Sequence, residues 1–164
     1  VILMPAARNP LKERPNASGR DRLEMVRRLV SERSGMAVSD LEITKGGASY
    51  AVETMAELQM ARPAEYWFIV GADAAKEIGQ WKQPAKLLKL CRLGVVLRRP
   101  LTKSQLLAAV PEEARASMDF IEMEPLDVSA TDIRDRIARG LSADPWIPPQ
   151  VLQYIKQCHL YGAK

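Results

Sequence analysis

The segment Asp127–Arg136 (DVSATDIRDR) gathers hydroxyl, carboxylate and guanidinium groups within a short stretch of chain. Ser129 and Asp132 have the spacing of a capping box, which predicts the start of a helix. Arg134 falls in the first turn, where the helix dipole disfavours a cation, so a nearby anion would explain its place. Free N–H groups at a helix start bind phosphate, and the Ser129 and Thr131 hydroxyls would add contacts. Plain capping and phosphate binding both fit this segment.

Other candidate groups follow predicted strands. Asp73, two residues after Gly71, either caps the next helix or accepts hydrogen bonds from ribose hydroxyls, while Gly71 allows a ligand close to the backbone. Trp81 is either a core lid or a stacking platform for a flat ring. The remaining polar residues at strand ends are Arg8, Asn9, Lys12, Arg98 and Arg99. The two adjacent arginines are either solvated or suited to a triphosphate.

The elements that must position these groups alternate along the chain. Apolar runs predict strands at Val1–Met4, Val38–Thr44, Tyr66–Val70, Leu93–Leu97 and Met118–Glu122. Helix starts are predicted at Ser18, after the Lys45–Gly47 turn, at Pro84, at Ser129 and at Pro148. This order predicts one α/β domain, a Rossmann-like doubly wound parallel sheet with Tyr66–Val70 as a central strand. In such sheets ligands bind beyond the carboxyl ends of the strands.

Composition narrows the class of protein. The chain has 164 residues and a net charge of +4 with scattered arginines, which favours small anionic ligands over nucleic acid. Cys91 and Cys158 lack the spacing of a zinc site or a disulfide framework, so a reducing cytoplasm is expected. No apolar run has the length of a membrane span. His159, the single histidine, is expected at a helix end and not as a base. The sequence leaves open whether the protein forms a homo-oligomer.

Six segments in this order resemble bacterial nicotinate mononucleotide adenylyltransferase across essentially the whole chain. They are PAARNPLK, GGASY, FIVGAD, GQWK, LRRP and DVSATDIRDRIARG. The stretch VSATDIR is similar to the family's second nucleotidyltransferase motif and is the most specific of the six. The resemblance favours the phosphate-binding interpretation of this helix start.

The resemblance implies transfer of the adenylyl group of ATP, with Mg²⁺, to nicotinate mononucleotide, which gives deamido-NAD and pyrophosphate. Phosphate contacts are then expected from Lys12, Ser129, Thr131 and Arg134, and contacts to ATP and its ribose from Gly71, Asp73 and Arg99. Trp81 would stack on the nicotinate ring. Tyr50, Ala51 and Lys82 would lie at the nicotinate carboxylate, mainly through backbone N–H groups.

Three departures from the family pattern matter. Leu11 stands where the loop usually has His, and Ala51 stands where the family usually has Thr. The family's first motif, Gly-Gly-x-Phe-Asp-Pro-x-His-x-Gly-His, is not in this sequence, and neither are its flanking strand and helix. The hypothesis is therefore an N-terminally truncated enzyme, consistent with a chain that begins at Val1. The central strand of its sheet would be missing, and its C-terminal helices would begin near residue 129.

Two other functions remain open. The chain could be a catalytically inactive nucleotide-binding or regulatory module that kept the phosphate-binding helix. It could also be an adenylyl- or cytidylyltransferase for another acceptor, such as phosphopantetheine. Trp81 argues against that acceptor, because a flat ring explains a stacking tryptophan better.

Overall fold

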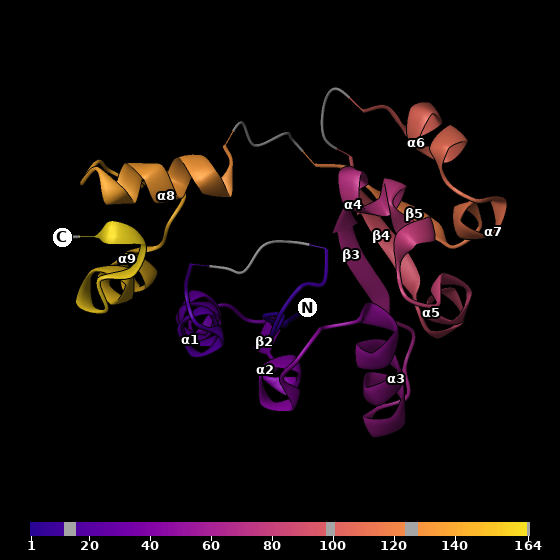
Figure 1. The fold of residues 1–164 in the computed structure, drawn as a ribbon, viewed down its shortest axis with the longest axis horizontal. Helices are drawn as coiled ribbons and strands as arrows, with labels where there is room; N and C mark the ends of the chain where they lie inside the picture. The colour runs from indigo at the N-terminus through magenta and orange to yellow at the C-terminus, as the bar shows by residue number, and fades with distance from the viewer. Residues whose placement is uncertain (12–15, 98–100, 124–127, 164) are drawn as a thin grey trace. The chain divides into compact units, whose positions relative to one another are not determined.

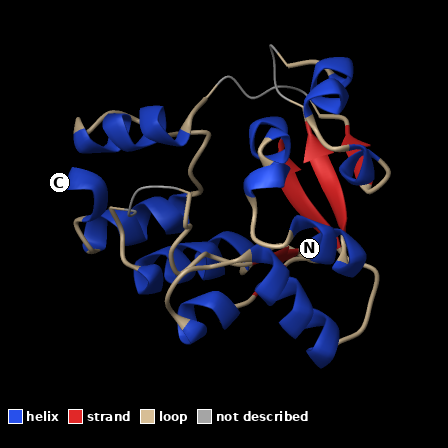
Figure 2. Ribbon diagram, turned by 45° about the vertical axis from the view of Figure 1, so that its right-hand side comes forward, coloured by secondary structure: helices blue, strands red, loops and turns tan. Residues whose placement is uncertain are grey.

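The computed structural model describes residues 1–11, 16–97, 101–123 and 128–163. Its strands fall in two parallel sheets, one of two strands and one of three, and helices join successive strands (Figures 1 and 2). The predicted parallel α/β class is confirmed. The chain forms two compact units, residues 1–49 with 127–164, and residues 50–126. The expectation of a single domain stays a prediction.

The first unit contains the two-stranded sheet and the C-terminal helices. Strands β1 (Ile2–Leu3) and β2 (Ala37–Val38) pair in parallel. Its helices are α1 (Gly19–Val30), α2 (Leu41–Lys45), α8 (Ala130–Ala138) and α9 (Pro149–Gln157), followed by the 3₁₀ turn η2 (Leu160–Gly162). Ile137, Val151 and Ile155 form its buried core, against which Met25 and Leu29 of α1 pack.

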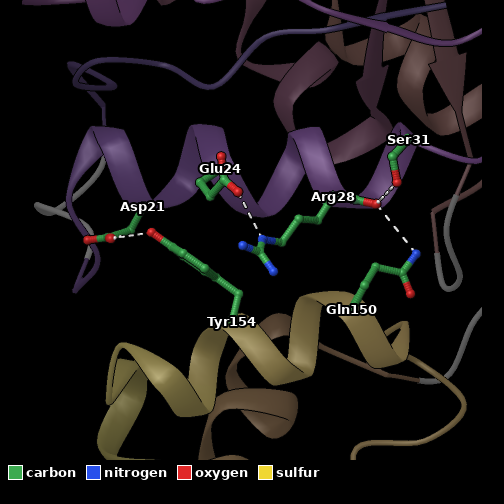
Figure 3. A network of polar contacts seen from close by, with 6 residues as sticks. All are labelled: Asp21, Glu24, Arg28, Ser31, Gln150 and Tyr154. Carbon is green, nitrogen blue, oxygen red and sulfur yellow. Dashed lines mark hydrogen bonds and ion pairs between the residues drawn. The ribbon is translucent and has the colours of Figure 1, made fainter.

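Polar contacts fix α1 against α9 beside this core (Figure 3). The Tyr154 hydroxyl donates to Asp21 at 2.9 Å, and the Arg28 guanidinium lies 4.7 Å from the centre of the Tyr154 ring. The Gln150 amide donates to the Arg28 carbonyl at 3.4 Å. At the start of α1 the predicted cap is confirmed, because the Ser18 side chain accepts from the Asp21 N–H. Helix α1 is thus anchored at its first turn and along its length.

The second unit contains the three-stranded sheet, in the order β3 (Trp67–Gly71), β4 (Arg92–Val96), β5 (Met118–Ile121). Its helical elements are α3 (Ala51–Ala61), α4 (Ala72–Lys76), η1 (Ile78–Gln80), α5 (Pro84–Leu90), α6 (Lys103–Ala109) and α7 (Glu112–Arg115). Val70, Leu93 and Val95 on one sheet face are buried with Ile78 and Leu87 of the helical elements. Burial of this face holds the unit together.

The opposite face of this sheet carries side chains that remain exposed. Trp67 and Ile69 are 49% and 54% exposed. The Asp119 carboxylate accepts two hydrogen bonds from the Arg92 guanidinium and one, at 2.7 Å, from the Trp67 indole. Hydrogen bonds from Arg92, the larger cause, and from Trp67 lower the pKa of the Asp119 carboxyl to about 2. One polar cluster therefore links all three strands across this face.

Two predictions about strands were wrong. Val38–Thr44 is not a strand, because β2 ends at Val38 and α2 begins at Leu41, with Asp40 at its cap position and Glu42 in its first turn. An alternating run this short fits a helical turn equally well. The strand predicted at Tyr66–Val70 is confirmed as β3, but it pairs with β4 alone among the described residues and lies at the edge of its sheet. The central position expected from its apolar run is therefore wrong, whereas the hypothesis of a missing strand leaves Tyr66–Val70 facing a gap. An apolar run indicates that a strand is at least partly buried, but it does not indicate whether the strand pairs along one edge or along both.

The remaining elements follow the predictions closely. Gly46 and Gly47 have φ of +70° and +72°, so the predicted turn before α3 uses the left-handed conformations that glycine favours. Pro84 occupies the first turn of α5, and Pro149 that of α9. His159 follows the end of α9, as expected. None of the helices among the described residues is long and apolar enough to cross a membrane.

Candidate functional site

The start of α8 has the predicted capping box. The Ser129 hydroxyl accepts from the Asp132 N–H at 3.1 Å, and the Asp132 carboxylate accepts from the Ser129 N–H at 3.1 Å. The same carboxylate accepts a hydrogen bond from the Ser129 hydroxyl at 2.5 Å. The hydrogen bonds from Ser129 lower the pKa of Asp132. The Ser129 hydroxyl caps the helix and therefore shapes its first turn. To donate a hydrogen bond to an anion, it would have to give up its bond to the Asp132 carboxylate.

Thr131 lies in the first turn of α8, and Arg134 follows three residues later, at the start of the second turn. The Arg134 guanidinium donates to the Thr131 hydroxyl at 3.0 Å, and Arg134 is half-buried while Thr131 is exposed. The first N–H groups of a helix have no partner within it, and they carry the positive end of the dipole. A forked cation, a hydroxyl and free N–H groups within the first two turns of a helix can bind an anion such as phosphate.

The end of β3 presents Gly71 and Asp73. A Cβ built on Gly71 meets nothing within 4 Å, so open space adjoins the backbone there. Asp73 was considered as a helix cap, but Gly71 is the cap residue of α4, and Asp73 lies inside the first turn with an exposed side chain. Its carboxylate is therefore not used in capping. An exposed carboxylate at the carboxyl end of a parallel strand is a type of group that can accept hydrogen bonds from a ligand.

Tyr50, Ala51 and Lys82 gather at the start of α3. The Lys82 ammonium lies 4.2 Å from the centre of the Tyr50 ring and 2.6 Å from a carboxylate oxygen of Glu53. Tyr50 is the cap residue of α3 and makes no side-chain capping bond, while its carbonyl accepts from the N–H groups of Glu53 and Thr54. The N–H groups at Ala51 thus belong to an uncapped helix start, which suits a carboxylate.

Trp81 precedes this lysine and is half-buried. Its ring lies 5.8 Å from that of Phe68, at an angle of 79°, and packs against the core of the second unit. This contact supports the core interpretation for one side of the ring and fixes its orientation. Gln83 follows Lys82 with φ of +49°, an unfavourable conformation for a residue other than glycine. The turn from Trp81 to Pro84 is therefore held in a specific conformation.

The predicted site residues fall into two sets. Ser129, Thr131 and Arg134 lie at the start of α8, in the first unit. In the second unit lie Tyr50, Ala51, Gly71, Asp73, Trp81 and Lys82. Lys12, Arg98 and Arg99 lie outside the described residues. Within the described part of the chain, no three His, Cys, Asp or Glu side chains gather as metal ligands.

Three residues next to these sets were not predicted as functional. Ser49 accepts the Ala7 N–H through its hydroxyl, and Glu53 pairs with Lys82. Arg22 donates to the backbone carbonyls of Ala6 and Ala7. A signal for Arg22 exists in the sequence, since it shares the helical spacing of the apolar stripe of α1. Glu53 lies three residues after the cap residue Tyr50, a position typical of capping acids, but its pairing with Lys82 joins residues distant in sequence.

Comparisons with known proteins agree on one family. The family described as "Cytidylyltransferase-like" matches residues 1–136. A probable nicotinate-nucleotide adenylyltransferase of Synechococcus sp. (strain JA-2-3B'a(2-13)) is 36% identical, and the match covers 98% of this chain and 81% of that protein. The protein of the same description from Herpetosiphon aurantiacus is 33% identical over 99% of this chain and 83% of its own length.

A solved structure supports the fold independently. The nicotinic acid mononucleotide adenylyltransferase of Plasmodium falciparum, complexed with NaAD, matches with a TM-score of 0.72 and 16% identity, over 99% of this chain and 82% of that one. At this identity the likeness shows the fold alone. It confirms the predicted nucleotidyltransferase type of α/β fold, while the predicted absence of a central strand stays a prediction.

Proposed function

The chain belongs to the cytidylyltransferase-like family and, within it, to the nicotinate-nucleotide adenylyltransferases, and we propose that it transfers the adenylyl group of ATP to nicotinate mononucleotide. An oxygen of the mononucleotide phosphate forms a bond to the α-phosphorus of ATP. The bond from that phosphorus to the bridging oxygen breaks, and pyrophosphate leaves. The products are deamido-NAD and pyrophosphate. No residue needs to form a covalent intermediate, so positioning and charge stabilisation can supply the catalysis.

The observation that carries this proposal is the arrangement of side chains at the start of α8. Arg134 and Thr131 are joined at 3.0 Å beside the capped helix start. We assign Ser129, Thr131 and Arg134 to the ATP phosphates, where negative charge accumulates on the leaving pyrophosphate. Arg134 offers a planar fork for phosphate oxygens, and Ser129 keeps the first turn in shape. From the sequence pattern alone, we also assign Lys12 and Arg99 to contacts with ATP.

The second set of residues is assigned to the other groups of the substrates. We assign Asp73 to the ribose hydroxyls, because its exposed carboxylate follows the open backbone at Gly71. Trp81, fixed on one side by Phe68, offers its remaining surface to the nicotinate ring. N–H groups at Ala51 and the Lys82 ammonium beside Tyr50 provide positive charge for the carboxylate of that ring.

Mg²⁺ is proposed to accompany ATP as its counter-ion. The described residues offer no group of three metal-binding side chains, and the Asp132 carboxylate is occupied by Ser129. Ligands for the ion would therefore come mainly from the phosphates themselves. We also propose a cytoplasmic location, since both cysteines are free and ATP is an intracellular substrate.

The test is adenylyl transfer by the purified chain with ATP, Mg²⁺ and one acceptor at a time. Nicotinate mononucleotide, nicotinamide mononucleotide and phosphopantetheine are compared, and the nucleotide product and pyrophosphate are measured together. The proposal expects deamido-NAD and pyrophosphate in equal amounts, with nicotinate mononucleotide as the best acceptor. Faster transfer to phosphopantetheine would favour the other transferase. ATP binding without product from any acceptor would favour the inactive nucleotide-binding module.

A further inference from the structure

Arg22 lies on a side of α1 that is otherwise apolar. It shares the lining of an apolar groove of about 400 Å³ with Met25, Val26 and Leu29, and it is half-buried. A guanidinium in such surroundings is costly unless its N–H groups find acceptors. The acceptors it has found are therefore informative about its role.

Backbone carbonyls from both ends of one loop accept the Arg22 hydrogen bonds. The Ala6 carbonyl accepts at 2.5 Å and the Ala7 carbonyl at 3.2 Å, directly after β1 and Pro5. The Ala17 carbonyl, just before the cap of α1, accepts from Nε at 3.4 Å. One side chain thus joins the entry and exit of the segment between β1 and α1. Residues 12–15 of that segment lie outside the described part.

Ser49 holds the same backbone from another direction. Its hydroxyl accepts the Ala7 N–H at 2.9 Å, and its own N–H donates to the Arg8 carbonyl at 2.8 Å. The Ala7 N–H and carbonyl are therefore both bound, one by Ser49 and the other by Arg22. This arrangement fixes the chain at the carboxyl end of β1, the edge where parallel sheets bind ligands.

The helix that carries Arg22 is itself fixed. Asp21, its neighbour, bonds to Ser18 at the helix cap and to Tyr154 of α9, as Figure 3 shows for Tyr154. Tyr161 of η2 packs against the buried core of this unit, to which Ile137 of α8 also belongs.

We propose that Arg22, supported by Ser49, is a positioning residue that fixes the backbone following β1 for binding of the ATP phosphates. This inference rests on the proposed function. Arg22 does not touch the substrate in this role, because its guanidinium binds the carbonyls of Ala6, Ala7 and Ala17. Its effect is transmitted through the backbone that it holds. The apolar groove beside it is not part of the proposal.

The experiment compares Arg22→Ala, Arg22→Lys and Ser49→Ala with a matched control on the same helix. Arg27→Ala is that control, because Arg27 lies on the same helix and its side chain pairs with Asp40 at 3.5 Å in an exposed ion pair. For each variant of the full chain, hydrogen exchange is followed in the peptide covering residues 5–11. Dissociation constants for ATP and for nicotinate mononucleotide are measured by calorimetry, and kcat and KM in the transfer assay.

Arg22→Ala is expected to speed exchange in residues 5–11 and to lower kcat/KM for ATP on the order of 100-fold, the effect of a displaced positioning group. Affinity for ATP should fall while affinity for nicotinate mononucleotide changes less than about twofold, since the proposal concerns the ATP phosphates alone. Arg22→Lys should recover only part of the loss, because an ammonium cannot reproduce the fork. The loss of kcat/KM for ATP should be smaller for Ser49→Ala than for the two Arg22 variants. Arg27→Ala should match wild type.

Other outcomes separate this inference from the proposed function. If Arg22→Ala speeds exchange but leaves ATP binding and kcat unchanged, the positioning role is wrong while the proposed function stands. Equal losses for both substrates would also overturn it, since that pattern indicates general destabilisation. If wild type neither binds ATP nor transfers its adenylyl group, the proposed function fails, and the inference fails with it. Should Arg22→Ala not fold, Arg22→Lys and Ser49→Ala decide by the same criteria.

Discussion

The Lys82 ammonium lies 2.6 Å from a carboxylate oxygen of Glu53, although the two residues are far apart in sequence. Lys82 follows the short turn η1, and Glu53 belongs to the first turn of α3. Their side chains are 43% and 34% exposed, so the pair contributes little to stability. Its larger effect is electrostatic, because it sets a negative charge beside the positive groups assigned to the nicotinate carboxylate.

Glu53→Gln is expected to lower the KM for nicotinate mononucleotide by about threefold, the scale of a partly exposed charge interaction. Removing the carboxylate leaves the Lys82 charge and the start of α3 free to attract the carboxylate of the substrate. The KM for nicotinamide mononucleotide, which lacks that charge, should not change. Steady-state kinetics with both acceptors measure this. Glu57→Gln removes the same charge one turn later and is the control. A rise in KM for the nicotinate form would show instead that Glu53 is needed to hold Lys82 in place.

Ser129→Ala is expected to reduce the free energy of unfolding by about 1 kcal/mol, because the first turn of α8 loses its cap. The chain offers a matched control in Thr102, which forms a capping box with Gln105 at the start of α6. Thr102→Ala should cost a similar amount of stability. Only Ser129→Ala should also raise the KM for ATP. Urea unfolding and steady-state kinetics on both variants test this, and an equal effect on KM would contradict the assignment of α8 to ATP.

Arg134→Lys is expected to lower kcat/KM for ATP by a factor of roughly 10 to 100, because a bidentate charge-assisted contact becomes a single one. Lysine keeps the positive charge at position 134, so a loss of kcat/KM would result from the changed geometry of the contact and not from a change in net charge. Arg139→Lys, at the end of the same helix, is the control and should leave kcat/KM unchanged. Unfolding of both variants should resemble wild type. Equal activity of Arg134→Lys and wild type would remove the guanidinium fork from the mechanism.

Asp119→Asn is expected to destabilise the chain at neutral pH, with a difference that disappears in acid. The folded chain holds the pKa of Asp119 at about 2, below the ordinary value of 3.8, through the hydrogen bonds from Arg92 and Trp67. A lowered pKa gives stability that is complete above 3.8 and is lost as pH falls towards 2. Unfolding followed across this range should show wild type and variant converging. Arg92→Gln should give the same pattern, and a difference independent of pH would rule out the ion pair as its cause.

Several local features followed from the sequence because the interactions responsible are local. Ser18 and Ser129 cap their helices by bonding to residues three positions away. The consecutive glycines before α3 adopt the turn that their missing side chains allow. The strand at β3 and the segment at β4 followed from uninterrupted apolar runs, although burial covers only one face of β3.

Features that depend on distant residues were predicted less well. The segment after Val38 contains both an alternating pattern and a helix cap, and local spacing could not decide between them. The edge position of β3 depends on which strands pair, and an apolar run holds no information about that. Asp73 was considered as a cap, whereas the structure gives that place to Gly71.

The sequence by itself determined the α/β class, the helix starts and the grouping of Ser129, Thr131 and Arg134, since each of these depends on residues within one turn or one strand. Only the tertiary structure placed Glu53 beside Lys82 and Arg22 between Ala7 and Ala17. Such contacts exist because packing brings separate elements together, and burial then requires each polar group to find a partner. The residues that bear charge could therefore be read from the sequence, while the groups that hold them in position came from the fold.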